Sequence, residues 1–230
     1  MFLANILFIY FHLRLVWTCG ISQPMLIVGF VSQKGGVGKS TLARALALEG
    51  VREDLRVKIA DLDPQQGTAV AWAMRRMASG IEPAIAAEPF RNVSDALAAC
   101  GGLDLLILDG PARASRETLA IAKASDLLIQ PSGTAIDDLD PAIRLFHELV
   151  AAGVDRGRLV IVLSRAGTEA EERDARDYVT RAGFEVLPGA LIERAGYRQA
   201  QNAGFAVQEA RHTALATRAQ ELMKAISDRI

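Results

Sequence analysis

Short apolar runs alternate with longer helical segments along most of this chain. The runs have strand composition and lie at residues 25–31, 56–60, 103–108, 126–131 and 158–163, with shorter candidates at 83–87 and 184–187. The segments of helical composition lie at residues 40–50, 69–77, 92–99, 115–124, 141–152, 169–182 and 215–230. Strands that read as continuous apolar runs are typical of a parallel sheet covered on both faces. The pattern therefore predicts an α/β fold with a doubly wound, mostly parallel sheet flanked by helices.

Residues 1–24 depart from this alternation because they are apolar over most of their length. The stretch is about as long as a minimal membrane span, but Arg14 near its middle would be costly in a spanning helix. The order of charge and apolar residues is also wrong for a secretory signal. We therefore expect a single domain at residues 25–230, with Met25 as its natural start. Residues 1–24 are then an N-terminal extension from an upstream translation start or a loosely attached helix, and a membrane anchor is the alternative.

Composition narrows the classes of function. With 230 residues, 50% of them hydrophobic, the chain is long enough for one sizeable α/β core. Its 26 basic and 27 acidic residues give a net charge of -1, so any nucleic-acid site must be a local patch. The two cysteines, Cys19 and Cys100, lack metal-ligand spacing and indicate no disulfide framework, which is typical of the reducing cytoplasm.

The strongest local signal is the segment 29–41, which reads G-F-V-S-Q-K-G-G-V-G-K-S-T. It follows an apolar run and opens an alanine- and leucine-rich helix, which is the strand, loop and helix order of a phosphate-binding loop. Its glycines lack the Cβ atoms that would keep backbone N–H groups away from phosphates, and the helix start adds partial positive charge. Lys39 is placed to reach the outer phosphates and the Ser40 hydroxyl to bind Mg²⁺. The loop residues predicted to bind ATP are Lys34, Gly35, Gly36, Val37, Gly38, Lys39, Ser40 and Thr41.

Acidic residues end two of the apolar runs. Asp61 and Asp63 lie in D-L-D-P-Q-Q-G after one run, and Asp109 ends another in D-G-P. Open α/β sheets place their chemistry at these carboxyl ends of the strands. An aspartate at the tip of a buried strand beside a phosphate loop is the Walker B arrangement, which holds Mg²⁺ through water. We therefore predict that Asp109 and Ser40 share a magnesium ion.

These motifs resemble those of the ParA/MinD family of dimerising ATPases. The general phosphate-loop pattern begins with a glycine, where this chain has Gln33, and the chain instead carries Lys34 in K-G-G-V-G-K-S. That sequence is similar to the family's deviant Walker A motif. D-L-D-P-Q is similar to the switch I segment of the family, and D-G-P-A to its Walker B and switch II segment. The resemblance covers nearly all of residues 25–230, and the C-terminal region with F-A-V-Q-E resembles small plasmid-type ParA proteins, the ParF-like branch.

The resemblance implies a P-loop NTPase fold and a role for each of these residues. Lys34 would reach the nucleotide bound by the partner subunit. With Lys39 and Asp63 it would form the catalytic set, in which Asp63 positions or activates the attacking water. Asp61 would support the magnesium shell. Gly110 would sense the γ-phosphate, because its N–H can approach the phosphate closely and a side chain there would obstruct the movement.

Two further segments have expected ligands. In the family, the segment after the strand at 158–163 contacts the adenine ring and often begins with an asparagine, and here Ser164 and Arg165 take that place. Towards the C-terminus, arginines outnumber acids locally, and such arginines bind DNA phosphates without reading base sequence. The alternative is that they only solvate helix ends. The predicted DNA-binding residues are Arg194, Arg198, Arg211 and Arg218.

The resemblance implies a Mg²⁺-dependent ATPase that forms a homodimer on binding ATP and acts in plasmid or chromosome partitioning. The ATP-bound dimer would bind non-specific DNA, a ParB-like centromere-binding protein would be its partner, and the protein would be cytoplasmic and nucleoid-associated. A MinD-like positioning ATPase at the membrane is one alternative, although the segment 215–230 is only weakly amphipathic. A metabolic P-loop enzyme is another, for which the sequence offers no further catalytic residues. A reductase of the nitrogenase iron-protein type is excluded, because it needs two cysteines per subunit at the dimer axis and Cys19 lies outside the domain.

Overall fold

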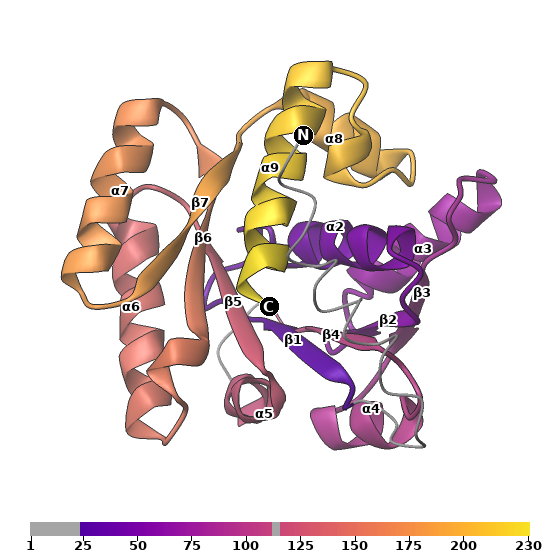
Figure 1. Cartoon of the computed structure of the whole chain (residues 1–230), viewed down its shortest axis with the longest axis horizontal. Helices are drawn as coiled ribbons and strands as arrows, with labels where there is room; N and C mark the ends of the chain where they lie inside the picture. Colours follow the sequence, from indigo (N-terminus) through magenta and orange to yellow (C-terminus); the bar gives the residue numbers. More distant parts are fainter. Residues whose placement is uncertain (1–23, 112–115) are drawn as a thin grey trace, which may run out of the picture.

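A parallel sheet with helices on both faces forms the body of the computed structural model, which describes residues 24–111 and 116–230 (Figure 1). The strands are β1 (Leu26–Phe30), β2 (Val57–Asp61), β3 (Ala86–Pro89), β4 (Leu105–Asp109), β5 (Leu127–Ser132), β6 (Leu159–Ala166) and β7 (Glu185–Ile192). They form one 7-stranded sheet in the order β3-β2-β4-β1-β5-β6-β7. Every neighbouring pair is parallel. The predicted doubly wound α/β fold with a parallel sheet is confirmed.

Two layers of helices cover the sheet. In the described part of the chain they are α2 (Lys39–Arg52), α3 (Thr68–Ala78), α4 (Val93–Ala99), α5 (Arg116–Ala124), α6 (Ile136–Ala151), α7 (Glu169–Arg181), α8 (Ala195–Asn202) and α9 (Thr213–Arg229), with short 3-10 helices η2 (Arg156–Arg158) and η3 (Val207–Glu209). One apolar cluster joins α2, α3, α8 and α9 to one face, and a second joins α4 to α7 to the other. Within β4, Leu105 and Ile107 belong to the first cluster and Leu106 and Leu108 to the second. Both sets are buried, which explains why the strand reads as a continuous apolar run.

The strand register brings the predicted acids to one edge. Phe30 at the end of β1 pairs with Asp109 of β4, and Asp61 of β2 pairs with the same residue. The phosphate-loop segment 31–38 leaves the sheet at this level, between β1 and α2. The strand order reverses at β1, because β4 and β5 lie on opposite sides of it. Open α/β sheets bind their ligands at such a point.

One helix begins earlier than its sequence pattern indicated. We expected a helix from residue 141, with Pro141 at its start, but α6 begins at Ile136 and contains that proline in its second turn. Asp137 and Asp138 occupy its first turn, where negative charge is stabilised by the free N–H groups of a helix start. Pro141 costs the helix one backbone hydrogen bond.

The two C-terminal strands are longer than predicted. We expected a turn at Pro188 and Gly189, but β7 continues through both residues. Gly189 has a φ of 81° and the pairing with β6 shifts register nearby, so a bulge lets the strand continue. Pro188 is tolerated because β7 lies at the edge of the sheet. β6 likewise extends through Arg165, whose φ is 58°, to Ala166.

Some predictions fall outside the described residues. Residues 1–23 and 112–115 are not described, so neither the proposed extension nor the last residue of D-G-P-A is placed. Among the helices of the described part, none has the length and apolar character needed to cross a membrane.

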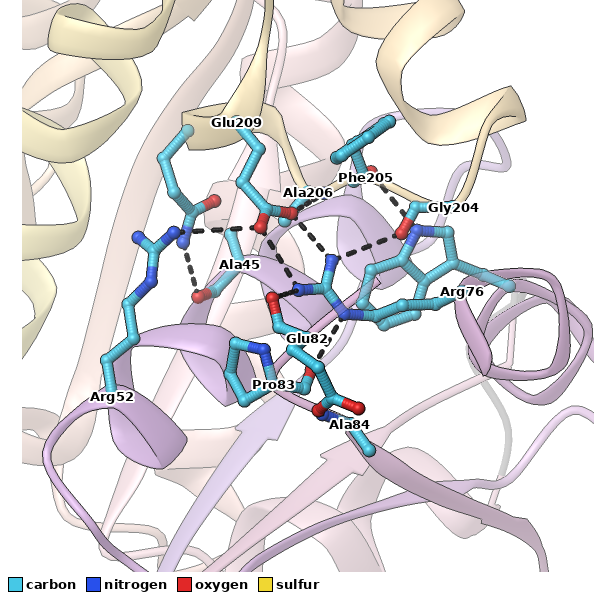
Figure 2. A network of polar contacts seen from close by, with 12 residues as sticks. Ala45, Arg52, Arg76, Glu82, Pro83, Ala84, Gly204, Phe205, Ala206 and Glu209 are labelled. Atoms are coloured by element: carbon cyan, nitrogen blue, oxygen red, sulfur yellow. Dashed lines mark hydrogen bonds and ion pairs between the residues drawn. The ribbon is translucent and has the colours of Figure 1, made fainter. Parts of the chain in front are cut away.

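A buried arginine fastens the C-terminal segment to α3 (Figure 2). The Arg76 side chain is 1% exposed and forms two hydrogen bonds with the Glu209 carboxylate, of 2.7 and 3.0 Å. Its remaining donors bind the carbonyl oxygens of Gly204, Glu82 and Pro83. Each guanidinium nitrogen therefore has a partner, and the segment between α8 and α9 is held against the helix that follows β2.

Candidate functional site

The loop 31–38 has the backbone of an anion-binding site. Gly36 and Gly38 have φ values of 76° and 108°, which favour glycine. Gly38 precedes α2, which has no side-chain cap and no acid in its first turn. The first helical hydrogen bond runs from Leu42 N to Gly38 O, so the N–H groups of residues 39–41 precede the helical ladder. Such N–H groups and the helix dipole favour a bound phosphate.

A cavity of about 240 Å³ opens beside this loop. It is bounded by α2, the loop after β2, the start of α3 and the end of β4. The predicted site residues in its lining are Gly36, Gly38, Lys39, Ser40, Thr41, Asp63, Asp109 and Gly110. The lining also includes Arg44, Gln66 and Thr68, for which the sequence gave us no role. The residues predicted to bind ATP or Mg²⁺ that lie outside the lining are Lys34, Gly35, Val37, Asp61, Ser164 and Arg165.

Asp109 is the most strongly perturbed carboxylate of the site. It is 2% exposed, and its Oδ1 atom has no hydrogen-bond partner among the described residues. Burial raises the pKa of Asp109 to about 7, although Ser40 and the nearby cations oppose the shift. Lys39 is buried beside it, and burial lowers the pKa of that lysine against the pull of Asp109 and Asp63. A buried carboxylate oxygen without a partner is costly, so this edge of the sheet is suited to a cationic ligand.

The two aspartates after β2 have different surroundings. Asp61 is buried, and its two oxygens accept hydrogen bonds from the N–H groups of Asp63, at 3.1 Å, and Ala69, at 2.9 Å. It therefore fixes the loop and the start of α3, and its support of a magnesium shell stays a prediction. Asp63 is partly exposed and lines the cavity, with one oxygen 3.3 Å from the Gln66 amide nitrogen.

Arg44 is the functional candidate that sequence reasoning missed. It lies on α2 one turn after Thr41, is 7% exposed and lines the cavity. Its guanidinium donates to the Thr68 carbonyl at 2.7 Å and to the Gln201 side chain at 3.1 Å. Burial lowers the pKa of Arg44 to about 10. The signal was present in the sequence, because this arginine interrupts the otherwise apolar segment L-A-R-A-L-A-L.

Lys34 points away from the cavity. Its Nζ lies 2.7 Å from Asp138 Oδ1 at the start of α6, and its side chain is 43% exposed. Val37 is buried, and Gly35 is exposed. Lys34 and Lys39 are only five positions apart in the sequence, but their side chains lie in different places. Of the two, only Lys39 lines the cavity.

Gly110 is explained by packing in this structure. Its N–H donates to the Phe30 carbonyl at 2.9 Å, and a Cβ atom there would lie 2.7 Å from the same oxygen. The glycine is therefore needed for the close approach of β1 and the end of β4. A role for Gly110 in sensing the γ-phosphate stays a prediction.

The two residues expected at the adenine ring lie outside the cavity. Ser164 is buried under the loop, where a Cβ added at Gly38 would meet its hydroxyl at 2.9 Å. Arg165 is exposed and forms an ion pair of 2.8 Å with Glu193. Contact of either residue with adenine stays a prediction.

The four C-terminal arginines have unequal freedom. Arg194 and Arg198 are exposed, and both hydrogen-bond Glu193, the first to its carbonyl and the second to its carboxylate. Arg211 is exposed in the segment before α9. Arg218 is only 30% exposed and is bound to Glu172 and to the Ala190 carbonyl. Arg218 is thus engaged within the fold, whereas the other three present charge to solvent.

Comparison with known proteins agrees with this architecture. The chain is 28% identical over 227 residues to an iron-sulfur cluster carrier protein of Pseudomonas fragi, covering 80% of this chain and 78% of that protein. Among solved structures, it is similar to the cell division ATPase MinD of Pyrococcus furiosus, with a TM-score of 0.70 and 16% identity over 90% of this chain and 100% of the other. It is also similar to a putative plasmid partition protein of Borrelia burgdorferi bound to AMPPNP, with a TM-score of 0.68 and 15% identity over 90% and 100%.

These structural likenesses concern the fold, because the identities are low. The family assignment comes from the model of the CobQ/CobB/MinD/ParA nucleotide binding domain, which matches residues 28–204. That range includes the phosphate loop, both aspartate segments and the whole of α8. The chain therefore belongs to the CobQ/CobB/MinD/ParA nucleotide-binding family.

Proposed function

We propose that this chain is a Mg²⁺-dependent ATPase whose ATP-bound homodimer binds non-specific DNA in plasmid or chromosome partitioning. Family membership supports nucleotide binding, and the phosphate loop, the cavity and Asp109 support ATP and Mg²⁺ as its ligands. The observation that carries the dimerisation step is the position of Lys34, the additional lysine of the loop, which lies outside the cavity of its own chain.

The residues present fit ATP and Mg²⁺. The N–H groups of residues 39–41 and the Lys39 ammonium would hold the phosphates, and Ser40 and Asp109 would hold the metal. The unpaired Oδ1 of buried Asp109 supports a cation as a ligand of this site. When bound, Mg²⁺ neutralises charge on the phosphates and helps to stabilise the transition state.

Asp63 is the residue we propose to orient the attacking water. It lies in the loop after β2, lines the cavity and is partly exposed. Phosphoryl transfer needs a group that positions the nucleophile more than it needs a covalent catalyst. Asp61 would support Asp63 through the hydrogen bond to its amide.

Lys34 supports a trans contribution between subunits. Its ammonium is paired with Asp138 in the isolated chain, in a half-exposed contact that contributes little to stability. A phosphate of a second subunit's nucleotide would offer it a stronger, charge-assisted partner. Dimerisation would then depend on ATP, because the lysines of two subunits repel each other without nucleotide.

DNA binding is proposed to follow from dimerisation. Arg194, Arg198 and Arg211 are exposed, and each phosphate contact adds to a salt-dependent affinity. One chain offers few such contacts, whereas a dimer presents two copies on one particle. A ParB-like partner that stimulates hydrolysis belongs to the same proposal.

The structure gives less support to the rival functions. A MinD-like membrane role would use the apolar face of a C-terminal helix, but Ala219, Leu222, Met223 and Ile226 of α9 are all buried in the core. The relative named as an iron-sulfur cluster carrier raises a second rival. Clusters are held by cysteine thiolates, whereas Cys100, the cysteine in the described part of this chain, is buried and its thiol pKa is raised by burial.

Light scattering with a slowly hydrolysed ATP analogue tests the proposal. The wild-type chain should double in mass with the analogue and Mg²⁺, and Lys34→Ala should bind the analogue yet remain a monomer. Lys224→Ala is the matched control, since Lys224 also pairs with an aspartate, Asp228, at 2.7 Å but lies on α9. The control should dimerise like the wild type.

A salt titration on non-specific duplex DNA completes this test. The wild type with the analogue should bind with a steep salt dependence, and Lys34→Ala with a shallow one. An analogue-dependent dimer that persists in Lys34→Ala would refute the bridging role. A wild-type dimer that ignores DNA but sediments with liposomes would favour the membrane alternative.

A further inference from the structure

Two hydroxyl groups of the cavity have hydrogen-bond partners within the chain. The Ser40 hydroxyl lies 2.9 Å from the Thr68 hydroxyl, and the Thr41 hydroxyl donates to the Gln201 side-chain oxygen at 3.0 Å. Both serine and threonine belong to the cavity lining beside the loop, whereas Gln201 does not. A ligand that takes up either hydroxyl must therefore compete with a contact inside the protein.

Arg44 binds the partner of each hydroxyl. Its Nη2 atom donates to the Thr68 carbonyl at 2.7 Å, and its Nη1 atom donates to the same Gln201 oxygen at 3.1 Å. The side chain is packed at 5.5 Å from the centre of the Trp72 ring, and its Nε has no partner among the described residues. The guanidinium is thus fixed between α2, α3 and α8.

Gln201 links α8 to Thr41 and Arg44 of α2. It lies in the last turn of α8, one turn after Arg198, and its oxygen accepts from both Thr41 and Arg44 of α2. The hydroxyl of Thr41 has one hydrogen to donate. If it donates that hydrogen to a phosphate oxygen, Gln201 loses one of its two contacts with α2.

We propose that Arg44 and Gln201 are positioning residues that couple nucleotide occupancy to the mobility of α8. In the nucleotide-free chain, the two hydrogen bonds to Gln201 restrain α8 against α2. Nucleotide binding breaks the hydrogen bond from the Thr41 hydroxyl to Gln201 and loosens this restraint. Arg44 keeps its hydrogen bonds to Gln201 of α8 and to Thr68 at the start of α3. The inference rests on the proposed function in one respect, namely that the cavity takes a nucleoside triphosphate.

This coupling would regulate the surface proposed to bind DNA. Arg198 lies on α8 and Arg194 immediately precedes it, so a change in the helix reaches both arginines. Because the cavity and α8 would then be two linked sites, their coupling must have a measurable size, and couplings of this kind commonly amount to about fivefold to a hundredfold.

Hydrogen exchange of the α8 amides tests the coupling in the full chain. In the wild type, the slowly hydrolysed ATP analogue with Mg²⁺ should speed exchange in α8 by about tenfold. Gln201→Leu should exchange fast with or without the analogue, because the restraint is already lost. Gln201→Glu keeps the acceptor and should restore slow exchange without analogue and the response to it. Gln199→Leu, the same change at an exposed position of α8, is the matched control and should behave like the wild type.

Binding of the analogue is measured in parallel, so that a failure of this inference can be told apart from a failure of the proposed function. A purely structural role for Gln201 would slow or speed exchange equally in both states and leave the response to the analogue intact, and that result would overturn the inference. So would a wild-type α8 whose exchange does not respond to bound analogue. A wild-type α8 that responds, in a protein whose analogue-bound form ignores DNA, would instead support the inference and refute the proposed partition function.

Discussion

Two buried polar clusters on the same side of the sheet differ in one respect. Around Arg76, all three guanidinium nitrogens have partners in Glu209 and three carbonyls (Figure 2). Around Asp109, one carboxylate oxygen has no partner in the described part of the chain, and burial raises the pKa of Asp109 to about 7. Both side chains are almost inaccessible, at 1% and 2% exposure.

The difference separates structure from function. A buried charge with every donor satisfied stabilises one conformation, and removing its partner is strongly destabilising. A buried charge with an unsatisfied oxygen lowers stability until a ligand supplies the missing contact. We therefore propose that the Arg76 cluster serves folding and the Asp109 cluster serves binding, and the following experiments are chosen to separate the two.

The largest expected effect is on hydrolysis. Asp109→Asn removes the proposed metal-binding charge, and because metal contributions reach several kcal/mol, turnover should fall at least about a hundredfold. Lys39→Ala should abolish turnover as well, since it removes the charge at the outer phosphates. A steady-state phosphate-release assay measures both, and wild-type turnover in either variant would contradict the placement of the active site.

The next largest effect is on stability, at the other cluster. Arg76→Met leaves the Glu209 carboxylate buried without its main partner and should lower the free energy of unfolding by about 3–5 kcal/mol. Urea denaturation followed by circular dichroism measures this, with the neighbouring exposed residue in Arg75→Met as the control. A loss below about 1 kcal/mol, as for a surface pair, would mean that the cluster is not the fastening we describe.

The pH dependence of stability should report Asp109. Because its pKa is raised in the folded state, the neutral form is favoured there, so its contribution is present below about pH 4 and is lost as the pH rises through about 7. The upper limit of the loss is on the order of 4 kcal/mol. Asp109→Asn should lack this component, so the difference between the two nucleotide-free proteins in urea denaturation at pH 5 and pH 8 isolates it. An identical pH dependence in both would contradict the raised pKa.

Asp63 should separate binding from chemistry. Asp63→Ala removes the proposed water-positioning group while leaving the loop, Lys39 and Asp109 in place, so hydrolysis should stop but analogue-driven dimerisation should persist. The variant should accumulate as a DNA-bound dimer with ATP itself. A loss of ATP affinity together with activity, measured by equilibrium dialysis, would make Asp63 a metal-binding or structural residue.

The smallest effect concerns the half-exposed pair of Lys34 and Asp138. Asp138→Asn frees the lysine at a cost below about 1 kcal/mol to folding. Because the released ammonium no longer has to leave an ion pair, the analogue-dependent dimer should form at up to about fivefold lower protein concentration. Sedimentation velocity over a dilution series measures this, and weaker dimerisation would mean that Asp138 helps the dimer.

The sequence was sufficient to predict the parts of the molecule that depend on local patterns. The loop 31–38, the aspartates at strand ends and the parallel sheet follow from apolar runs and glycine spacing. The partners of Arg44 and Arg76 did not follow, because Gln201 and Glu209 lie 157 and 133 positions further along the chain and meet them only when α8 and η3 fold back. Arginines inside apolar helical segments were the visible signal in both cases.

Strand and helix ends were also only partly predictable. β7 passes through Pro188 and Gly189 because an edge strand tolerates a proline and a bulge, which depends on its place in the sheet. The motif predicted a functional role for Lys34, but it did not predict the ion pair of Lys34 with Asp138, which depends on where α6 begins.

The most direct test of the central claim is the stabilisation of the chain by Mg²⁺ and the slowly hydrolysed ATP analogue, measured by thermal unfolding of three proteins. At 100 times the dissociation constant, the wild type should gain about 2.7 kcal/mol. Arg76→Met should start lower and gain as much, whereas Asp109→Asn should start higher than the wild type and gain much less. Equal gains in the wild type and Asp109→Asn, or a gain lost in Arg76→Met, would contradict the assignment of the two clusters.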